Sequence, residues 1–384
     1  MKNQTILLLF VIIISIGCRA TDTGIDTTLV YAECQASIDS IYSANPKSVG
    51  IMVHVESPKN NLSWSGCSGY SNKDQSIKLA CDQPALIASS IKPYVATTIL
   101  RLQEQNKLTI EDPIGIHLTE KTAKLFQTDG YDLDAIRVKH LLSHTSGIYN
   151  YANGAYLDMI QNNKLHRWTR DEQLNLSIEM GSPLGSPADT FVYADANYLL
   201  ATEIIETVSD LPFYSAMRKL LKYEELGLED TWFPTLEKPN PTTKKLVHQY
   251  WSSREWDSYD IDPSFDLYGG GGIASTTSDI AQFAYSLFQG KIIEDTTIFN
   301  KIFTQIIPSN GEDMGYYLGL GEGTSNGLTY YGHGGFWGTT VLYFPELEAS
   351  IAVYILDRDQ FHLRKQVTNA VVKQIANHLE RDGK

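Results

Sequence analysis

The chain begins with alternating helix and strand patterns. Residues 29–42 carry apolar side chains at helical spacing, and residues 48–54 and 62–70 have the composition of strands. A second helical pattern covers residues 89–105. These segments predict a helix, two strands and then a longer helix.

In the rest of the chain, a region with helix and loop patterns is followed by a region with strand patterns. Residues 112–256 contain few period-two runs and many Asn, Asp, Tyr and Pro residues, so they predict helices and loops. Strand patterns return near the carboxyl end at 328–333, 339–344 and 350–356, and a final helical pattern covers 363–379. Turn residues separate the three strands, which predicts an antiparallel meander.

Strands at both ends of the chain with helices between them predict an α/β (α+β) fold. Residues 29–115 and 265–384 would together form a sheet domain, an antiparallel sheet flanked by helices. Residues 116–264 would form a mainly helical insertion domain. An active cleft is expected where the two parts meet.

The composition is that of a globular protein. The chain has 384 residues, of which 42% are hydrophobic and 20% charged, so it can bury a large core. Its formal net charge of −14 argues against a nucleic-acid partner, because phosphate binding needs clustered Lys and Arg. The same charge favours solubility and attracts cationic ligands better than anionic ones.

The amino terminus has the pattern of an export signal. An apolar run at 6–14 is too short to span a bilayer and follows a single lysine. It leads to Ser-Ile-Gly-Cys, which resembles a bacterial lipobox with Cys18 as the lipidation site; ordinary cleavage after Ala20 is the alternative. Residues 1–20 are therefore predicted to be a signal peptide and residues 21–28 a tether. The mature protein would be periplasmic or at the cell surface, held to the membrane by its lipid.

Three cysteines follow Cys18, and an exported protein can hold disulfides. Cys67 and Cys81 flank a short polar stretch, so they could close a loop, or they could be two buried thiols. Cys34, in the first helical segment, would then remain unpaired.

Motifs for metals and cofactors are missing from the sequence. It contains no CxxC pair and no HExxH run, so we expect no metal site and no cofactor. The glycine run at 269–272 lacks the spacing of a phosphate-binding loop, and it predicts either a hinge or a close approach of the backbone.

The strongest local feature is the sequence Ser89-Ser90-Ile91-Lys92-Pro93. Because proline is tolerated only in the first turn of a helix, Pro93 places Ser89 at or within one residue of a helix N-terminus. Lys92 lies three residues on, so both side chains share one face. A serine hydroxyl becomes a nucleophile when a neighbouring amine takes its proton. Taken alone, the pattern also fits a capping serine followed by a solvated lysine.

Four more segments extend this pattern. Residues 193–195 are Tyr-Ala-Asp and residues 333–335 are His-Gly-Gly, while residues 138–147 are VKHLLSHTSG and residues 271–279 are GGIASTTSD. In order and spacing these segments resemble motifs of the serine β-lactamase and penicillin-binding protein superfamily, in the branch of class C β-lactamases, D-Ala-D-Ala carboxypeptidases, D-aminopeptidases and related esterases. The resemblance implies a β-lactamase/transpeptidase-like fold in which Ser-x-x-Lys, Tyr-x-Asn and Lys/His-x-Gly motifs share one cleft.

The resemblance implies a catalytic role for each matching residue. Ser89 would form an acyl-enzyme, and Lys92 and Tyr193 would share the proton transfers, with nearby positive charge lowering the pKa of the phenol. The backbone amides of Ser89 and Phe336 would form the oxyanion hole. His333, partly charged at neutral pH, would hydrogen-bond to Tyr193 or to a substrate carboxylate.

Other residues are expected to bind the substrate or support the site. Gly334 and Gly335 lack side chains, so a substrate backbone could lie against their strand. Trp337 and several tyrosines are candidates for lining the cleft, although aromatic side chains are more often core residues. His140 and His144 have the spacing of metal ligands on a helix, but the resemblance makes them structural. The tyrosines are Tyr149, Tyr151, Tyr156 and Tyr268.

One motif departs from the family pattern. Asp195 stands where the family has Asn, and an ionised carboxylate only accepts hydrogen bonds, whereas an amide also donates them. Asp195 would also favour the charged form of Lys92 and weaken it as a base. We therefore expect poorer recognition of the acylamide arm of penicillins and peptides, and a relative preference for esters or for a different amide geometry.

These features together predict an exported serine hydrolase that forms an acyl-enzyme with a small ester or amide. D-Ala peptides and β-lactams are the substrates that the resemblance implies. The alternative is a penicillin-binding sensor that is acylated without turnover. The sequence leaves the substrate, among small molecules and peptides, and the oligomeric state open.

Overall fold

The structure is a computed structural model that describes residues 27–381. The predicted signal peptide, with Cys18, lies outside the described residues. Helix α1 (Thr27–Ala44) begins inside the segment predicted as a tether, two residues before the predicted start of the sheet domain. No helix between residues 27 and 381 is long and apolar enough to cross a membrane.

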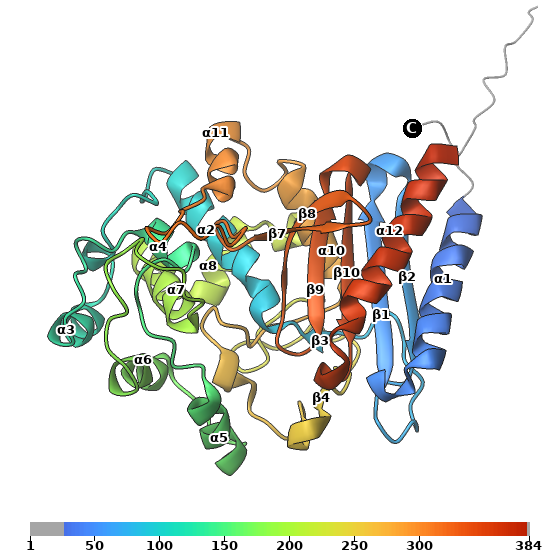
Figure 1. Cartoon of the computed structure of the whole chain (residues 1–384), viewed down its shortest axis with the longest axis horizontal. Helices are drawn as coiled ribbons and strands as arrows, with labels where there is room; N and C mark the ends of the chain where they lie inside the picture. Colours follow the sequence, from blue (N-terminus) through green and yellow to red (C-terminus); the bar gives the residue numbers. More distant parts are fainter. Residues whose placement is uncertain (1–26, 382–384) are drawn as a thin grey trace, which may run out of the picture.

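Both ends of the chain build one antiparallel sheet of six strands, in the order β2-β1-β10-β9-β8-β7 (Figure 1). The predicted strands and the predicted meander are present, and the edge strand β7 is additional. The strands are β1 (Gly50–Ser57), β2 (Leu62–Gly69), β7 (Gly321–Ser325), β8 (Leu328–Gly334), β9 (Thr339–Phe344) and β10 (Ala349–Ile355).

Helices cover both faces of this sheet. Helices α1 and α12 (Leu363–Arg381) pack on one face, and α10 (Thr277–Phe288) packs on the other. Alternate residues of β1 point to opposite faces, so Val53 joins the core under α1 and α12 whereas Met52 joins the core on the α10 side. Because both faces are covered, β1 and β10 are buried along their whole length. The prediction of an antiparallel sheet flanked by helices is confirmed.

The middle of the chain is helical, as predicted, and lies to one side of the sheet (Figure 1). Between residues 116 and 264 the only strands have two residues each. Helix α2 (Lys92–Glu104) leads from the sheet part and packs against α7 and α8. The helices of this part are α3 (Glu120–Thr128), α4 (Val138–Leu142), α5 (Gly154–Asn162), α6 (Arg170–Glu179), α7 (Asp195–Ser209), α8 (Phe213–Leu220) and α9 (Tyr223–Leu226).

Short elements connect the two parts. Strands β3 (Ala85–Leu86) and β6 (Ala274–Ser275) pair with each other, and the 3-10 helix η3 (Ala88–Ile91) joins β3 to α2. The other short strands and the remaining α-helix are β4 (Tyr250–Trp251), β5 (Trp256–Asp257) and α11 (Thr296–Phe299). The chain that enters α2 is therefore paired with the chain that enters α10.

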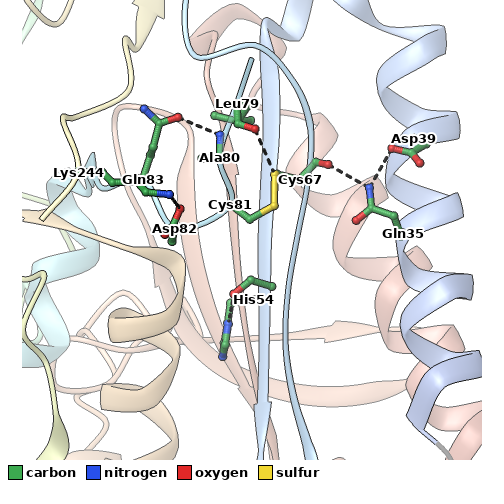
Figure 2. Close-up of a disulfide and its surroundings, with 11 residues drawn as sticks. Gln35, Asp39, His54, Cys67, Leu79, Ala80, Cys81, Asp82, Gln83 and Lys244 are labelled. Carbon is green, nitrogen blue, oxygen red and sulfur yellow. Dashed lines mark hydrogen bonds and ion pairs between the residues drawn. A yellow bond between two sulfur atoms is a disulfide. The ribbon is translucent and has the colours of Figure 1, made fainter. Parts of the chain in front are cut away.

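A disulfide joins Cys67 of β2 to Cys81, which decides between the two alternatives left open by the sequence (Figure 2). Cys34 is free and buried in α1, as expected. The segment that follows Cys81 is fastened by an ion pair between Asp82 and Lys244. This segment continues into β3, so the bridge restrains the part of the chain that leads to Ser89.

Candidate active site

Ser89 lies on a strained turn between β3 and α2. Ala88, the residue before it, has a φ of 47°, in the left-handed region that residues with a side chain rarely adopt. Ser89 follows in η3, and Pro93 occupies the first turn of α2. The predicted position of Ser89 at a helix start is correct, but the turn that holds it is a 3-10 turn. Its backbone amide is in the first turn, where an N–H has no intrahelical acceptor.

Lys92 is fully buried behind Ser89 and links three groups. Its Nζ donates to Ser89 Oγ at 3.0 Å, to Asp195 Oδ1 at 2.8 Å and to the Gly270 carbonyl at 3.3 Å. Nζ also lies 4.9 Å from the centroid of the Tyr193 ring. The predicted Ser-Lys-Tyr group is therefore assembled around one buried ammonium group.

The charge of Lys92 is set by Asp195, the first residue of α7. Burial is the largest single effect and lowers the pKa of Lys92, but Asp195, together with smaller contributions from Tyr193 and Asp266, outweighs it and raises that pKa above its usual value. Lys92 is thus an ammonium ion at neutral pH, as expected from a carboxylate at this position. The carboxylate itself lies in the first turn of α7, where the helix dipole favours negative charge.

The pKa of Tyr193 is not lowered, contrary to the prediction. Burial raises it to about 12, and Lys92 together with hydrogen bonds to Lys92 and Ser89 only partly opposes this increase. Asp195 also raises it. The phenol is therefore protonated at neutral pH and can act as a hydrogen-bond donor.

His333 differs from the prediction in both partner and charge. Its Nδ1 is 2.7 Å from the Gly334 carbonyl and its Nε2 is 3.1 Å from the hydroxyl of Tyr316, a residue that the sequence did not single out. Because a carbonyl only accepts, Nδ1 carries the proton and Nε2 accepts from Tyr316. Burial, followed by the charge of Lys92, lowers the pKa of His333 to about 3. The ring is neutral at pH 7 and offers no charge to a substrate carboxylate.

The loop after β8 supplies the second amide expected in an oxyanion hole. Between residues 27 and 381 the Phe336 amide has no backbone acceptor, which leaves it available to a ligand. Gly335 is required by close packing: a Cβ there would collide with the Ile87 carbonyl oxygen in the turn before Ser89. Gly335 thus brings the end of β8 against the turn of Ser89.

A cavity of about 390 Å³ opens at Ser89. It lies where the sheet part and the helical part meet, as expected for the cleft. Eight of the predicted residues line it, and the other lining residues include two from the segment before the glycine run. The lining residues are Ser89, Tyr151, Ala152, Tyr156, Leu157, Tyr193, Asp195, Phe265, Asp266, His333, Gly334, Phe336 and Arg358.

Trp337 does not line the cavity, so its predicted role as a substrate contact is corrected. Its side chain is 2% exposed and packs against Trp256 and Phe265 in the core. The neighbouring residue Phe336 lines the cavity instead. Of the four candidate tyrosines, Tyr151 and Tyr156 line it, whereas Tyr149 and Tyr268 do not.

Asp266 lines the cavity although no motif in the sequence marks it. Its Oδ2 is buried and has no hydrogen-bond partner in the described part of the chain. Burial, followed by repulsion from Asp195, raises the pKa of Asp266 well above its usual value. A Cβ on Gly271 would collide with Oδ2. The glycine run therefore allows a close approach of the backbone beneath this carboxyl group, one of the two roles considered for it.

The two histidines of residues 138–147 have structural partners. His140 Nδ1 accepts from the Arg137 amide at 3.1 Å, and His144 Nδ1 accepts from the Ala194 amide at 3.2 Å. The His144 ring also packs against the Tyr193 ring, with centroids 4.2 Å apart. No cluster of His, Cys, Asp and Glu side chains suited to a metal ion is present in residues 27–381.

Known proteins resemble this chain in sequence and in fold. A family model described as "Beta-lactamase" matches residues 45–373. The putative penicillin-binding protein PbpX of Bacillus subtilis (strain 168) is 28% identical over 264 residues, 68% of this chain and 60% of that protein. The teichoic acid D-alanine hydrolase of Staphylococcus aureus is 23% identical over 315 residues, 80% of this chain and 70% of that protein. The chain therefore spans less than two thirds of the length of PbpX.

Solved structures share the fold. The D-amino acid amidase from Ochrobactrum anthropi SV3, in complex with L-phenylalanine amide, superposes with a TM-score of 0.76 and 22% identity, over 92% of this chain and 99% of that one. The predicted β-lactamase/transpeptidase-like fold is confirmed by this match.

Proposed function

The chain belongs to the β-lactamase family, and we propose that it is an exported serine hydrolase that forms an acyl-enzyme with small esters or amides. The observation that carries the proposal is the 3.0 Å hydrogen bond from Lys92 Nζ to Ser89 Oγ at the cavity. A buried amine in contact with a serine hydroxyl is the arrangement that nucleophilic catalysis needs.

Ser89, Lys92 and Tyr193 can together carry out the formation and hydrolysis of an acyl-enzyme. Ser89 Oγ bonds to the substrate carbonyl carbon while its proton passes to the neutral form of Lys92. The amides of Ser89 and Phe336 donate to the oxyanion. As the bond to the leaving group breaks, the Tyr193 hydroxyl gives that group a proton, and the Lys92 ammonium then restores it. Water releases the acyl group by the same steps in reverse order.

Asp195 limits the rate of this series of reaction steps. Its charge keeps most Lys92 in the ammonium form at neutral pH, so the base is present as a minor fraction. Substrates with good leaving groups depend least on general acid and base assistance. This supports the expectation that esters react better than penicillins or peptides.

The same ion pair favours a second candidate, a penicillin-binding sensor that is acylated without turnover. Attack of water on the acyl-enzyme needs a base as much as the first step does. With Lys92 held as an ammonium ion by Asp195, deacylation would be the slower half of the reaction.

Export and membrane anchoring are part of the proposal. The pattern of residues 1–20 and the candidate lipid site at Cys18 support them. The disulfide between Cys67 and Cys81 supports an oxidising compartment, because cytosolic thiols are kept reduced.

Steady-state and burst kinetics test the proposal. We would measure p-nitrophenyl acetate, a D-Ala-D-Ala peptide and a penicillin with the wild type, Ser89→Ala and the exposed-serine control Ser309→Ala. Sustained ester turnover that Ser89→Ala lowers at least a thousandfold, and Ser309→Ala leaves intact, supports the hydrolase. One equivalent of product without further turnover indicates the sensor. Unchanged turnover in Ser89→Ala would show that Ser89 is not the nucleophile.

A further inference from the structure

A second cavity, of about 370 Å³, lies between the first turns of α12 and strands β7, β8 and β9. Side chains alternate along β8, so Tyr330, which packs with the core under α12, points to the face opposite His333. This cavity is therefore separate from the one at Ser89. Its lining residues are Thr324, Ser325, Tyr330, Thr340, Leu342, Phe361, His362, Arg364, Lys365, Thr368 and Asn369.

The lining of this second cavity is positively charged. Arg364 and Lys365 supply two cations, and no Asp or Glu of residues 27–381 is among the lining residues. A purely cationic lining stands out in a chain whose formal net charge is −14. Both residues lie in the first turn of α12, a helix of 19 residues, where the helix dipole adds positive potential. The lining therefore favours an anionic ligand.

Arg364 keeps donors for such a ligand. Its Nη1 donates to the Thr339 and Gly335 carbonyls at 2.6 and 3.4 Å, and its Nε donates to the Phe361 carbonyl at 3.1 Å. Nη2 has no hydrogen-bond partner among residues 27–381, and no carboxylate in that part of the chain pairs with the guanidinium. Burial, followed by the charge of Arg358, lowers the pKa of Arg364 to about 10, so this desolvated group is still a cation at neutral pH. An anion would supply the opposite charge that it lacks.

A buried hydroxyl one turn further along α12 favours the same kind of ligand. Thr368 is 2% exposed, and its Oγ1 has no hydrogen-bond partner in the described part of the chain. A buried polar group without a partner is costly, and a ligand that accepts a hydrogen bond from it recovers the cost. Asn369 accepts from Ser325 Oγ through its Oδ1 at 2.6 Å, which leaves its amide nitrogen as a further donor. Helical spacing places residues 364, 365, 368 and 369 on one face of α12.

The number and kind of these donors suit a phosphate ester. A guanidinium, an ammonium, a hydroxyl and an amide can bind more oxygen atoms than a carboxylate has, and arginine is well suited to phosphate recognition. Phe361, which is 50% exposed, and Leu342 give the lining an apolar side on which an organic group can lie. Inorganic phosphate would leave that apolar side in contact with water.

We propose that this second cavity binds the phosphate group of an ester with an apolar organic part. Arg364, Lys365 and Thr368 hold the phosphate, and Phe361 contacts the organic part. Because Arg364 also donates to the Gly335 carbonyl, the ligand lies directly behind the loop that carries the Phe336 amide. The inference does not depend on the proposed hydrolase function, since none of the residues that hold the ligand lines the cavity at Ser89.

Isothermal titration calorimetry with phenyl phosphate tests the inference. The variants are Lys365→Gln and Thr368→Val, and the control is Lys373→Gln, which removes the charge of an exposed lysine of the same helix outside the cavity. The titrations are made in about 0.1 M NaCl, where attraction between distant exposed charges is largely screened. The Kd for phenyl phosphate is expected to rise at least fivefold in each variant and to stay within twofold of the wild type in Lys373→Gln.

Inorganic phosphate and benzoate are each expected to bind the wild type at least fivefold more weakly than phenyl phosphate. Equal affinity of either would overturn the assignment to a phosphate ester. An unchanged Kd in Lys365→Gln would overturn the inference even if Thr368→Val does not fold, because Lys365 is exposed and its loss leaves the core intact. Competitive inhibition of p-nitrophenyl acetate hydrolysis by phenyl phosphate would place the ligand in the cavity at Ser89 and would overturn the inference as well.

Discussion

Replacing Asp195 with Asn removes the charge that holds Lys92 as an ammonium ion. The two groups are 2.8 Å apart, with side-chain exposures of 0% for Lys92 and 15% for Asp195, so solvent screens them little. An opposite charge this close changes the protonation equilibrium of its partner by a factor of about 10 to 1000. The Asn side chain still accepts a hydrogen bond from Nζ, which places the expected effect in the lower part of that range.

The neutral fraction of Lys92 at pH 8 should therefore rise about tenfold to a hundredfold in Asp195→Asn. Only the neutral amine accepts the Ser89 proton, so a lower pKa of Lys92 moves the rise of the rate–pH profile to lower pH. The rate constant for acylation by a fluorescent penicillin should increase by the same factor. The new amide also restores a donor for the acylamide arm of the penicillin.

The assay is acylation followed by fluorescence between pH 6 and 10, with the wild type, Asp195→Asn and the surface control Asp260→Asn. Circular dichroism establishes that each variant is folded. Acylation of folded Asp195→Asn that is no faster than the wild type at any pH would show that Asp195 does not control the charge of Lys92. So would a wild type that hydrolyses penicillins as fast as esters.

Three other substitutions probe the remaining groups. Tyr193→Phe removes the proton donor to the leaving group and should lower kcat about 10²- to 10⁴-fold, more for p-nitroanilides than for p-nitrophenyl esters; equal losses would contradict the assigned role. His333→Gln should leave the shape of the pH profile between pH 5 and 8 unchanged, because the pKa of His333 is about 3; a step near pH 6.5 that disappears in the variant would show a charged ring. Cys67→Ser opens a bridge with a sequence separation of 14 and should lower the free energy of unfolding in urea by about 3 kcal/mol, whereas an unchanged value would mean that the bridge does not constrain the chain.

The centre of the sheet was predictable because β1, β9 and β10 are apolar runs that turn residues separate. β9 and β10 are buried on both faces, and their composition alone marks them as strands. β7 was not predicted because its sequence, Gly-Glu-Gly-Thr-Ser, has no apolar alternation. It is held at the edge of the sheet by pairing with β8, a long-range interaction that its own residues do not signal.

The parts of the site that could be predicted are those whose residues lie close together in one sequence motif. Ser89 and Lys92 are fixed relative to each other by one helical turn, and their hydrogen bond follows from that spacing. Asp266 belongs to no motif, and only the fold brings it to Ser89. Trp337 was misassigned because the direction of a side chain after two glycines depends on the turn between β8 and β9 and not on composition.

The protonation states of the site residues were the property hardest to predict from the sequence. The neutral state of His333 follows from burial beside the Lys92 ammonium group, and the high pKa of Tyr193 follows from burial that the lysine does not overcome. Both depend on the distance and depth at which residues from distant segments meet.

Intact-mass measurement after incubation with a penicillin, a cephalosporin, a D-Ala-D-Ala peptide and a short-chain ester tests whether Ser89 is the nucleophile of an acyl-enzyme. We expect one acyl group per chain with at least one of these compounds, mapped by peptide analysis to Ser89 and absent from Ser89→Ala. An adduct on another residue, or an adduct that persists in Ser89→Ala, would contradict it.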